Sequence, residues 1–373
     1  MTQWDAKKPI RIGILLSQTG ALAKYECAHL QGTILGLEQI NEEGGIDGRA
    51  VEPIFCDPAS DIDRFRSLTH RLIADAEVSN IFGCCMSLNR KAVLPMVERS
   101  NILLWYPTQC EGFEYSPNIF YGGACPNQHV VPLGRYLVAS GRKRVFLIGN
   151  DYVFPRETNR VMRDVIEASG GEIVGESYVP IPADRDAFAP VFQNPALRQC
   201  DAIFSTVVGT SNLSLFEAYR AAKLDRGITP IAAINISEYD VVQIGAELLC
   251  GHLVVLAYLE SNKSAPNLAF VDRFKRRYGQ HARANLLVAS SYVQLRLFAE
   301  AINLCRSEAA EAVAEALVAV SLSGPLGAVR IDAESHYTYL KPIIAQVNPD
   351  GEFDIIHAAD TPVRPDPFMI AYQ

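Results

Sequence analysis

The sequence predicts an α/β fold built as two successive units of parallel strands and covering helices. Short apolar segments of strand length alternate with longer segments of helical periodicity. This alternation is interrupted at Gly122-Gly123 and then starts again. The 373 residues are enough for two domains at roughly 100–200 residues each. Repeated strand–helix units favour parallel sheets that are covered on both faces.

The first unit is expected to contain four strands and three helices. Gly44-Gly45 is typical of a helix end, and Asp61 is placed to cap the second helix. The predicted strands are residues 10–16, 51–56, 80–85 and 102–106, and the predicted helices are residues 25–42, 62–74 and 89–99.

The second unit repeats the pattern and is followed by further segments. Its predicted strands are residues 144–149, 172–179, 201–207 and 230–234. Its predicted helices are residues 128–139 and 155–169, and a further helix is expected between the last two strands. The remaining predictions are a strand at 252–258, helices at 268–278, 286–304 and 309–320, and β-structure from 327 to 356 with a turn at 348–351.

The composition is that of a globular protein with an acidic surface. Hydrophobic residues make up 49% and charged residues 20%, and the net charge is −8. These values exclude a disordered or collagen-like chain. A nucleic-acid-binding face would need clustered basic residues, and the short run Arg273–Arg277 is interpreted as a solvated helix face. No segment reaches the roughly 18–20 apolar residues that span a bilayer.

The N-terminus and the cysteines predict a cytoplasmic protein. Residues 1–8 lead directly into the first strand, whereas a secretory signal would have a longer apolar stretch and a small-residue cleavage site. The nine cysteines are odd in number and contain no C-x-x-C pair, which is typical of a reducing compartment. The alternative is a periplasmic protein whose signal peptide has been removed.

Common catalytic and cofactor motifs are absent from the sequence. There is no phosphate-binding P-loop, no G-x-G-x-x-G after the first strand and no G-x-S-x-G. The seven histidines do not show metal-binding spacing. We therefore expect no enzyme activity, cofactor or metal. An amidohydrolase with Cys85 or Ser87 as nucleophile is kept as a minor alternative.

Polar and aromatic side chains follow the ends of two strands of the first unit. Cys85 and Ser87 come after the third predicted strand, where a helix begins, and Tyr106 and Thr108 come at the end of the fourth. Unpaired backbone N–H groups and a serine hydroxyl at such a corner suit a carbonyl or carboxylate oxygen. The alternative is that Ser87 only caps the helix.

The second unit offers a similar set. Tyr152 and Phe154 follow one strand, Thr206 ends another, and the weaker candidates Ser237 and Glu238 follow a third. Ligands of open parallel sheets bind at the carboxyl ends of the strands, so these positions are candidate ligand contacts. The alternative for Glu238 is a surface residue at a helix start.

Several sequence strings resemble a known family. Ile14-Leu-Leu-Ser-Gln-Thr-Gly20, Ile40-Asn-Glu-Glu-Gly-Gly-Ile46 and Cys56-Asp-Pro are similar to the type I periplasmic-binding-protein fold of the branched-chain amino acid class. Longer strings resemble its subgroup of amide sensors and urea-binding proteins. They are Arg90-Lys-Ala-Val-Leu-Pro, Tyr106-Pro-Thr, Glu111-Gly-Phe-Glu-Tyr-Ser-Pro-Asn118, Asp151-Tyr-Val-Phe-Pro-Arg-Glu-Thr-Asn159, Phe204-Ser-Thr-Val-Val-Gly209 and Arg364-Pro-Asp-Pro367.

The resemblance implies two lobes joined by a three-strand hinge, with the ligand cleft between them. The N-terminal lobe would be residues 1–123 and 256–328, and the C-terminal lobe residues 124–255 and 329–373. The residues implied to line the pocket are Ser87, Tyr106, Thr108, Tyr152, Thr206, Val207 and Val208. Cys85 and Phe154 stand where the amide sensor has tyrosine, which puts an acetamide-like specificity in doubt.

The resemblance also implies a function. The leading hypothesis is a cytoplasmic sensor of a small amide or urea-like ligand that regulates amidase gene expression through an RNA-binding antiterminator protein, without binding nucleic acid or membrane itself. The alternative is the substrate-binding protein of an ABC transporter for urea, short amides or amino acids. For an amino acid, Glu238 would bind the ammonium group. A homodimer is left open.

Overall fold

The computed structural model describes residues 8–370, and the chain divides into two compact units. Unit 1 comprises Met1–Ala124 and Asn262–Leu340, and unit 2 comprises Cys125–Ser261 and Lys341–Gln373, so the chain passes between them three times. Residues 1–7, expected to lead into the first strand, and residues 371–373 lie outside the described residues. The expected boundary after residue 328 falls inside a hairpin strand, and unit 1 instead extends to Leu340.

Unit 1 is built on a five-stranded parallel sheet with the order β2-β1-β3-β4-β5. Register is set by pairs such as Ile10 with Val51 and Gly13 with Ile81. The strands are β1 (Ile10–Leu15), β2 (Val51–Cys56), β3 (Asn80–Gly83), β4 (Leu103–Tyr106) and β5 (Ile119–Tyr121). The central strands β3 and β4 are buried along their whole length.

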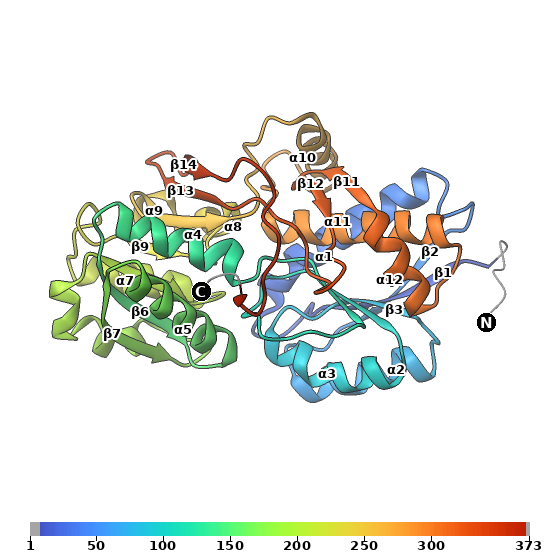
Figure 1. Ribbon diagram of the computed structural model, residues 1–373, viewed down its shortest axis with the longest axis horizontal. Helices are drawn as coiled ribbons and strands as arrows, with labels where there is room; N and C mark the ends of the chain where they lie inside the picture. Colours follow the sequence, from blue (N-terminus) through green and yellow to red (C-terminus); the bar gives the residue numbers. More distant parts are fainter. Residues whose placement is uncertain (1–7, 371–373) are drawn as a thin grey trace. The chain divides into compact units, whose positions relative to one another are not determined.

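Helices cover both faces of this sheet (Figure 1). On one side lie α2 (Ile62–Ala74), which Asp61 caps as predicted, and α3 (Ser87–Arg99). On the other side lie α1 (Ala23–Glu42) and α11 (Leu286–Cys305). The backbones of α1 and α11 come very close, because a Cβ atom on Gly32 would lie 2.1 Å from the Val288 carbonyl oxygen.

An aromatic cluster fills the space between the sheet and α11. Phe82 stacks on Trp105 with ring centroids 5.4 Å apart, and Phe298 of α11 meets both rings edge-on. Trp105 is fully buried and its indole N–H donates to Asn80 Oδ1 at 3.0 Å. The indole therefore contributes a large apolar surface to the core without leaving a donor unpaired.

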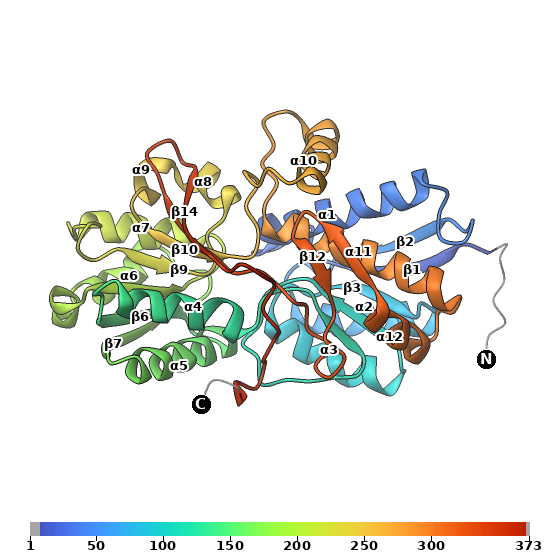
Figure 2. The ribbon, with the colours of Figure 1, turned by 45° about the horizontal axis from the view of Figure 1, so that its top comes forward.

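The remaining part of unit 1 is added after residue 262. It contains α10 (Ala265–Tyr278), α12 (Ala310–Ala319) and an antiparallel hairpin of β11 (Ser321–Gly324) and β12 (Gly327–Arg330), drawn in orange in Figure 2. The chain then returns to the sheet, where Tyr337 stacks on Tyr121 with ring centroids 4.0 Å apart. That contact keeps residues up to 340 in unit 1.

Unit 2 is built on a seven-stranded mixed sheet with the order β14-β13-β10-β9-β8-β6-β7. Five strands are parallel, and β13 and β14 run antiparallel at one edge. The strands are β6 (Arg144–Asn150), β7 (Glu172–Val179), β8 (Ala202–Thr206), β9 (Ile231–Ala233), β10 (Leu253–Leu256), β13 (Ile343–Val347) and β14 (Phe353–Ala358).

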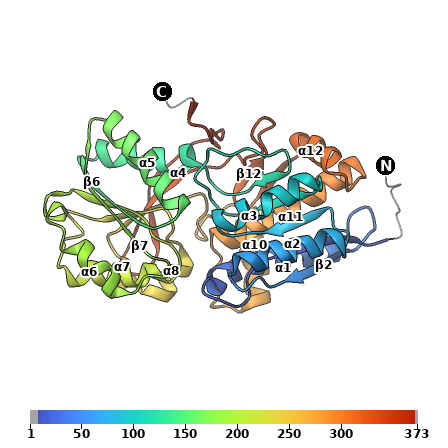
Figure 3. The ribbon, with the colours of Figure 1, turned by 90° about the horizontal axis from the view of Figure 1, so that it is seen from below.

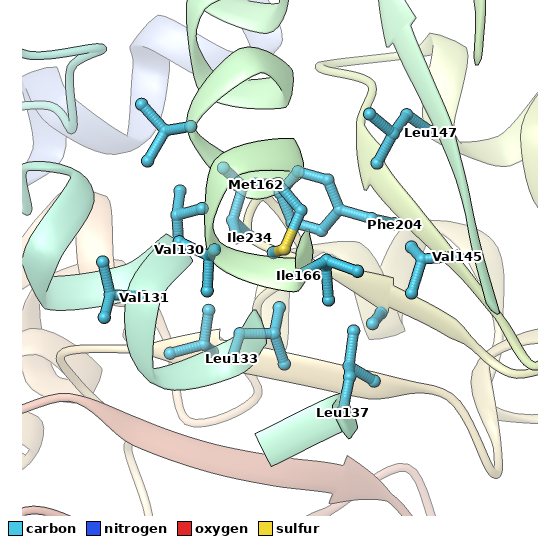
Figure 4. Packing of buried hydrophobic residues seen from close by; sticks show 14 of the residues in the cluster. Val130, Val131, Leu133, Leu137, Val145, Leu147, Met162, Ile166, Phe204 and Ile234 are labelled. Atoms are coloured by element: carbon cyan, nitrogen blue, oxygen red, sulfur yellow. The ribbon is translucent and has the colours of Figure 1, made fainter. Parts of the chain in front are cut away.

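Helices again cover both faces of the sheet (Figure 3). One layer is formed by α4 (Pro126–Ala139) and α5 (Val153–Ala168), the other by α6 (Arg185–Phe192) and α7 (Ser211–Ala221). The shorter elements are a 3-10 turn at Pro195–Gln199, α8 (Glu238–Ile244) and α9 (Ala246–Leu249). Figure 4 shows Leu133 of α4, Met162 of α5 and Phe204 of β8 packed together in the core of this unit.

The strand–helix alternation predicted from the sequence is present in both units, and the missed elements are short. Strand β5 has three residues, and helices α6, α8 and α9 have eight, seven and four. Segments of this length are too brief to establish a periodicity in the sequence. Within residues 8–370, none of the helices combines the length and apolar character needed to cross a membrane.

The α1–α11 contact predicts that Gly32→Ala destabilises the protein. At an exposed helical site this change would stabilise by about 1 kcal/mol, but here the added methyl group meets a backbone carbonyl. We expect a loss of about 2 kcal/mol from overpacking, measured by urea unfolding. Cys27→Ala, at an exposed position of the same helix, is the control and should be close to neutral. Unchanged or increased stability of Gly32→Ala would contradict the prediction.

Candidate functional site

The strand order places a topological switch point in each sheet. In unit 1, β1 lies between β2 and β3, so the chain leaves β1 in one direction and β3 in the other. In unit 2 the same arrangement occurs between β6 and β8. Ligands of such sheets bind outside the carboxyl ends of the strands at this point. The candidate site residues of each unit lie at or just after the carboxyl ends of its strands.

In unit 1 the chain makes a tight turn at the end of β3. A Cβ atom on Gly83 would lie 2.1 Å from the Leu15 carbonyl oxygen, and Cys84 has a left-handed φ of 61°. The Cys84 N–H donates to the same Leu15 carbonyl at 3.1 Å, which ties the ends of β1 and β3 together. Cys84 and Cys85 are buried. The turn leads directly into α3, of which Ser87 is the first residue.

Ser87 does not cap helix α3. The residue before the helix is Met86, and no side-chain capping hydrogen bond is present there. The Ser87 hydroxyl instead donates to Oε2 of Glu111 at 2.5 Å, and Ser87 is 2% exposed. Glu111 lies in the irregular segment between β4 and β5. The hydroxyl that the sequence identified is thus held in a fixed orientation by a carboxylate 24 residues away.

A buried ion-pair network surrounds this contact. Arg90 of α3 has no exposed surface and contacts Glu111 at 3.0 Å and Glu114 at 2.6 Å, and Lys91 contacts Glu114 at 2.6 Å. Burial acts to raise the pKa of Glu114, but the charges and hydrogen bonds of Arg90 and Lys91 together lower it to about 2. Burial likewise acts to lower the pKa of Arg90, and Glu111 and its other partners hold it well above its usual value. These contacts therefore favour the charged forms of Arg90 and Glu114.

Tyr106 and Thr108 lie at the end of β4. The Tyr106 hydroxyl donates to the Cys85 carbonyl oxygen at 3.0 Å, and the Arg90 guanidinium carbon lies 4.6 Å from the centroid of its ring. Burial raises the pKa of Tyr106 well above its usual value, so the phenol keeps its proton. Thr108 is 5% exposed. Tyr106 thus contacts Cys85 directly, and Arg90 contacts both Ser87 and Tyr106. Thr108 follows two residues after the end of β4.

Glu26 also lies in unit 1 near the switch point, and sequence reasoning missed it. It is in the first turn of α1 and has no exposed surface. Its Oε2 accepts from the Ser17 N–H at 2.5 Å, while Oε1 has no hydrogen-bond partner. Burial raises the pKa of Glu26 to about 7, although the Ser17 N–H acts in the opposite direction. A sequence signal existed: Glu26 precedes Leu30 by four positions, on the apolar stripe of the predicted helix.

The cysteines of this region are protonated thiols. Burial raises the pKa of Cys84 and of Cys85 above that of a free thiol, and the Glu26 charge acts in the same direction. A thiolate is the nucleophilic form of cysteine, and these surroundings disfavour it. The two residues offer small, weakly polar surfaces at the strand end.

In unit 2, Tyr152 and Phe154 lie where β6 leads into α5. Tyr152 is the residue before the helix and is half-buried, and Phe154 is 4% exposed within the hydrophobic core of the unit. Their ring centroids are 6.3 Å apart. Nearby, the Asn150 side chain accepts from the Val208 N–H at 2.9 Å and joins the ends of β6 and β8.

Thr206 ends β8, one residue before the predicted end, and Val207 and Val208 follow the strand. The polar groups of these residues have partners inside unit 2. The Thr206 hydroxyl is buried within hydrogen-bonding distance of Asn159 Oδ1, 3.1 Å, and the Ile148 carbonyl oxygen, 3.2 Å. The Val207 N–H donates to Ser205 Oγ at 3.3 Å. What these residues present besides these contacts is mainly the apolar surface of the two valines.

Ser237 and Glu238 begin helix α8. Ser237 caps the helix in a reciprocal pair with Asp240, whose Oδ2 accepts from the Ser237 N–H and hydroxyl, both at 2.9 Å. Glu238 is 2% exposed, so it is not the surface residue considered as the alternative. Its Oε1 accepts from the Glu260 N–H at 2.7 Å. Burial raises the pKa of Asp240 to about 6.

Among the described residues 8–370, no group of three or more His, Cys, Asp or Glu side chains is arranged to hold a metal ion. The chemistry of the two strand ends is that of hydrogen bonding and apolar contact. Hydroxyls, buried carboxylates and aromatic rings are the groups that orient small ligands in protein sites.

Comparison with known proteins shows the family. Residues 10–373 match the family described as periplasmic binding protein domain. The chain belongs to this family, as its sequence strings indicated.

Solved structures of solute-binding proteins share the fold over nearly the whole chain. An ABC transporter substrate-binding protein from Sphaerobacter thermophilus is 25% identical, with a TM-score of 0.84 over 96% of this chain and 100% of that one. A solute-binding protein from Rhodopseudomonas palustris in complex with p-hydroxybenzoic acid is 21% identical, with a TM-score of 0.86 over 98% and 100%. A branched-chain amino acid transporter substrate-binding protein from Streptococcus pneumoniae, in complex with isoleucine, is 22% identical, with a TM-score of 0.81 over 96% and 100%.

A curated relative matches only in part. Limonene hydroxylase from Geobacillus stearothermophilus is 29% identical over 126 residues, which is 34% of this chain and 23% of that protein. The chain thus spans about a quarter of that relative's length.

The buried carboxyl group of Glu26 predicts a pH-dependent stability. The native state keeps this proton up to about pH 7, whereas the unfolded chain releases it near the ordinary value of 4.5. The unfolded state therefore binds fewer protons between these values, and stability falls as the pH rises through them, by up to about 3 kcal/mol from this group. The difference in unfolding free energy between wild type and Glu26→Gln, measured in urea from pH 4.5 to 8, should fall accordingly.

Glu52→Gln, at an exposed position of β2, is the control and should give a difference that does not vary with pH. Because wild type and variant share Asp240, its titration cancels in the comparison. A pH-independent difference for Glu26→Gln would show that the carboxyl group is not buried in a way that perturbs its proton.

Proposed function

We propose that the protein binds a small polar ligand reversibly and serves as the solute-binding component of an ABC transporter. Membership of the periplasmic binding protein family supports this function, as does the likeness to transporter binding proteins along nearly the whole chain. The neighbours named above bind p-hydroxybenzoic acid or isoleucine, both small molecules that combine polar groups with an apolar body.

The observation that carries the proposal is the fixed set of polar side chains at the unit 1 switch point. Ser87 is bonded to Glu111, Tyr106 to the Cys85 carbonyl, and Glu26 to the Ser17 N–H. Side chains held in this way lose little conformational entropy when a ligand binds, and such preorganisation favours affinity. The proposed ligand contacts are Cys85, Ser87, Tyr106, Thr108, Tyr152, Phe154, Thr206, Val207, Val208, Ser237 and Glu238.

Binding without catalysis fits the chemistry better than the amidohydrolase alternative. A thiol nucleophile needs a lowered pKa, and burial raises that of Cys85. The Ser87 hydroxyl donates to Glu111, a carboxylate that is itself paired with Arg90.

The second candidate is the cytoplasmic amide sensor that acts through an RNA-binding antiterminator. The observation that favours it is the state of the cysteines: all nine lie within residues 8–370 and are free thiols, most of them buried. Free thiols in this number are typical of proteins from reducing compartments. In this case the ligand would shift the protein between two states that differ in affinity for the partner.

Ligand binding should stabilise the folded protein. We expect that at least one compound among urea, formamide, acetamide, butyramide, isoleucine, benzoate and 4-hydroxybenzoate raises the unfolding temperature in a thermal-shift screen. A ligand at 100 times its Kd adds about 2.7 kcal/mol of stability. Ser87→Ala should reduce the shift, and the exposed Glu52→Gln variant should retain it. A ligand effect that is the same in both variants would remove Ser87 from the site.

The sensor alternative has a separate test. Purified protein should retain a basic RNA-binding regulator encoded beside it in a pull-down, and the binding ligand found in the screen should change the amount retained. The control is a pull-down with a ligand from the screen that gives no thermal shift. Absence of retention with and without ligand would leave the transport function as the better explanation.

A further inference from the structure

Unit 2 contains a cavity that is lined by none of the candidate ligand contacts. It lies at the amino ends of the strands, because His252 on its wall directly precedes β10, whereas Thr206 marks the carboxyl end of β8. The other walls come from the end of α7, the loop after α7 and helix α9. The cavity volume is about 270 Å³, close to the lower limit of the roughly 300–1,000 Å³ of small-molecule sites. We call this cavity the His252 pocket.

The His252 side chain is a neutral ring with its hydrogen on Nε2. The residue is 2% exposed, and its Nδ1 accepts from the Ile231 N–H at 2.9 Å. Burial and the Arg226 charge lower the pKa of His252 to about 3, so the ring carries no charge at pH 7. In a neutral imidazole the nitrogen that accepts has no hydrogen, and the other nitrogen is the donor. Nε2 therefore has an N–H group to donate.

This Nε2–H group has no acceptor among the described residues. Ile231 is the one hydrogen-bond partner of the His252 side chain within residues 8–370. The rings of Phe216 and Tyr219 meet the imidazole edge-on, with centroid distances of 5.0 and 4.8 Å, and hold its orientation. Because Nδ1 faces β9, the Nε2–H is the polar group that the ring presents to the pocket. A buried donor without an acceptor is unfavourable, so the pocket favours a ligand that brings one.

The charge that acts on this donor is positive. Arg226 lines the pocket, and its Nη1 donates to two carbonyl oxygens at the end of α9, both at 2.9 Å. The two carboxylates of the lining are engaged elsewhere: Glu247 pairs with Arg220 at 3.0 Å, and Asp225 accepts from a backbone N–H at 2.8 Å. Arg226 is the charged residue that lowers the pKa of His252. An acceptor that carries negative charge is therefore favoured over a neutral one.

We propose that the His252 pocket binds a small carboxylate with an apolar body. One carboxylate oxygen accepts from the His252 Nε2–H, and the Arg226 guanidinium compensates the negative charge. Leu224 and Leu248, which also line the pocket, contact the apolar part of the ligand. This site is additional to the proposed ligand contacts at the carboxyl ends of the strands, where ligands of parallel sheets usually bind. It does not depend on the proposed transport function.

The first experiment follows the ring nitrogens of His252 by NMR in the full chain labelled with ¹⁵N-histidine. The probes are acetate, 4-methylpentanoate and benzoate, each compared with the corresponding amide. We expect a neutral ring with its hydrogen on Nε2 at pH 7 and a saturable shift of this signal with at least one carboxylate. The amide should bind about tenfold more weakly. A hydrogen on Nδ1, no response to any of the three carboxylates, or equal affinity for acid and amide overturns the proposal.

The second experiment tests the charge of Arg226. Arg226→Gln leaves the His252 signal in place, and the Kd of the carboxylate read from that signal should rise about threefold or more. Arg185→Gln is the matched control, because it removes the same charge from an exposed position of α6 outside the pocket. An unchanged Kd in Arg226→Gln, or an equal rise in Arg185→Gln, overturns the assignment of a carboxylate.

The third experiment removes the donor. In His252→Asn the side-chain oxygen can still accept from the Ile231 N–H, but no atom reaches the position of Nε2. Titration calorimetry should then count one carboxylate fewer per chain than in the wild type, and an unchanged count overturns the proposal. Ser87→Ala, which alters the proposed strand-end site, should keep the response of the His252 signal, so the two sites are tested separately. Should His252→Asn fail to fold, the signal is assigned through its contact with the Tyr219 ring and Arg226→Gln decides.

Discussion

A guanidinium group without contact to water constrains the whole candidate site of unit 1. Arg90 is completely buried, and a buried charge must be paired and hydrogen-bonded to be tolerated. Its partners Glu111 and Glu114 come from an irregular segment between β4 and β5, so that segment folds around α3. The same network then holds Ser87 through Glu111 and packs against the ring of Tyr106. Removing one partner of such a pair costs about 3–5 kcal/mol, which makes the site geometry inseparable from the stability of the unit.

The two units repeat one topology with different chemistry. Each sheet has its switch point between the first and third strands of its unit. In each unit one hydrogen bond joins the ends of these two strands. In unit 1 the tie is the Cys84 N–H to the Leu15 carbonyl, and in unit 2 it is the Val208 N–H to Asn150 Oδ1. The hydroxyls of Thr206 and Ser237 are used by neighbours inside unit 2. The strand ends of unit 1 carry a buried ion-pair network, whereas the buried carboxyl groups Glu238 and Asp240 of unit 2 accept from N–H and hydroxyl groups at the start of α8 and at Glu260.

The sequence was sufficient for the order of the longer strands and helices because that information is local periodicity. It also located the strand ends, and with them Ser87 and Tyr106, because a parallel sheet gathers its functional residues there. It was not sufficient for their partners: Glu111 follows Ser87 by 24 residues in a segment without periodicity, and nothing local indicates that its carboxylate turns back toward α3. Glu26 differs, since its place on the apolar stripe of α1 was visible. The acceptor that each hydroxyl hydrogen faces is a tertiary property, and no local pattern in the sequence reports it.

Several unfavourable features of unit 1 lie near its switch point. Cys84 has a left-handed backbone, Glu26 is a carboxyl group without exposure, and one oxygen of Glu26 has no partner. Each feature costs stability, and such costs persist where the surrounding structure imposes them, which is most often at functional sites. Buried atoms without a partner also occur beside the aromatic core, at Asn80 Nδ2 and Gln294 Oε1, but these belong to neutral amide groups. Glu26 differs from these amides because it is ionisable, and burying an ionisable group costs more than burying an amide. Its position next to the end of β1 therefore supports the proposal that this strand end recognises a ligand.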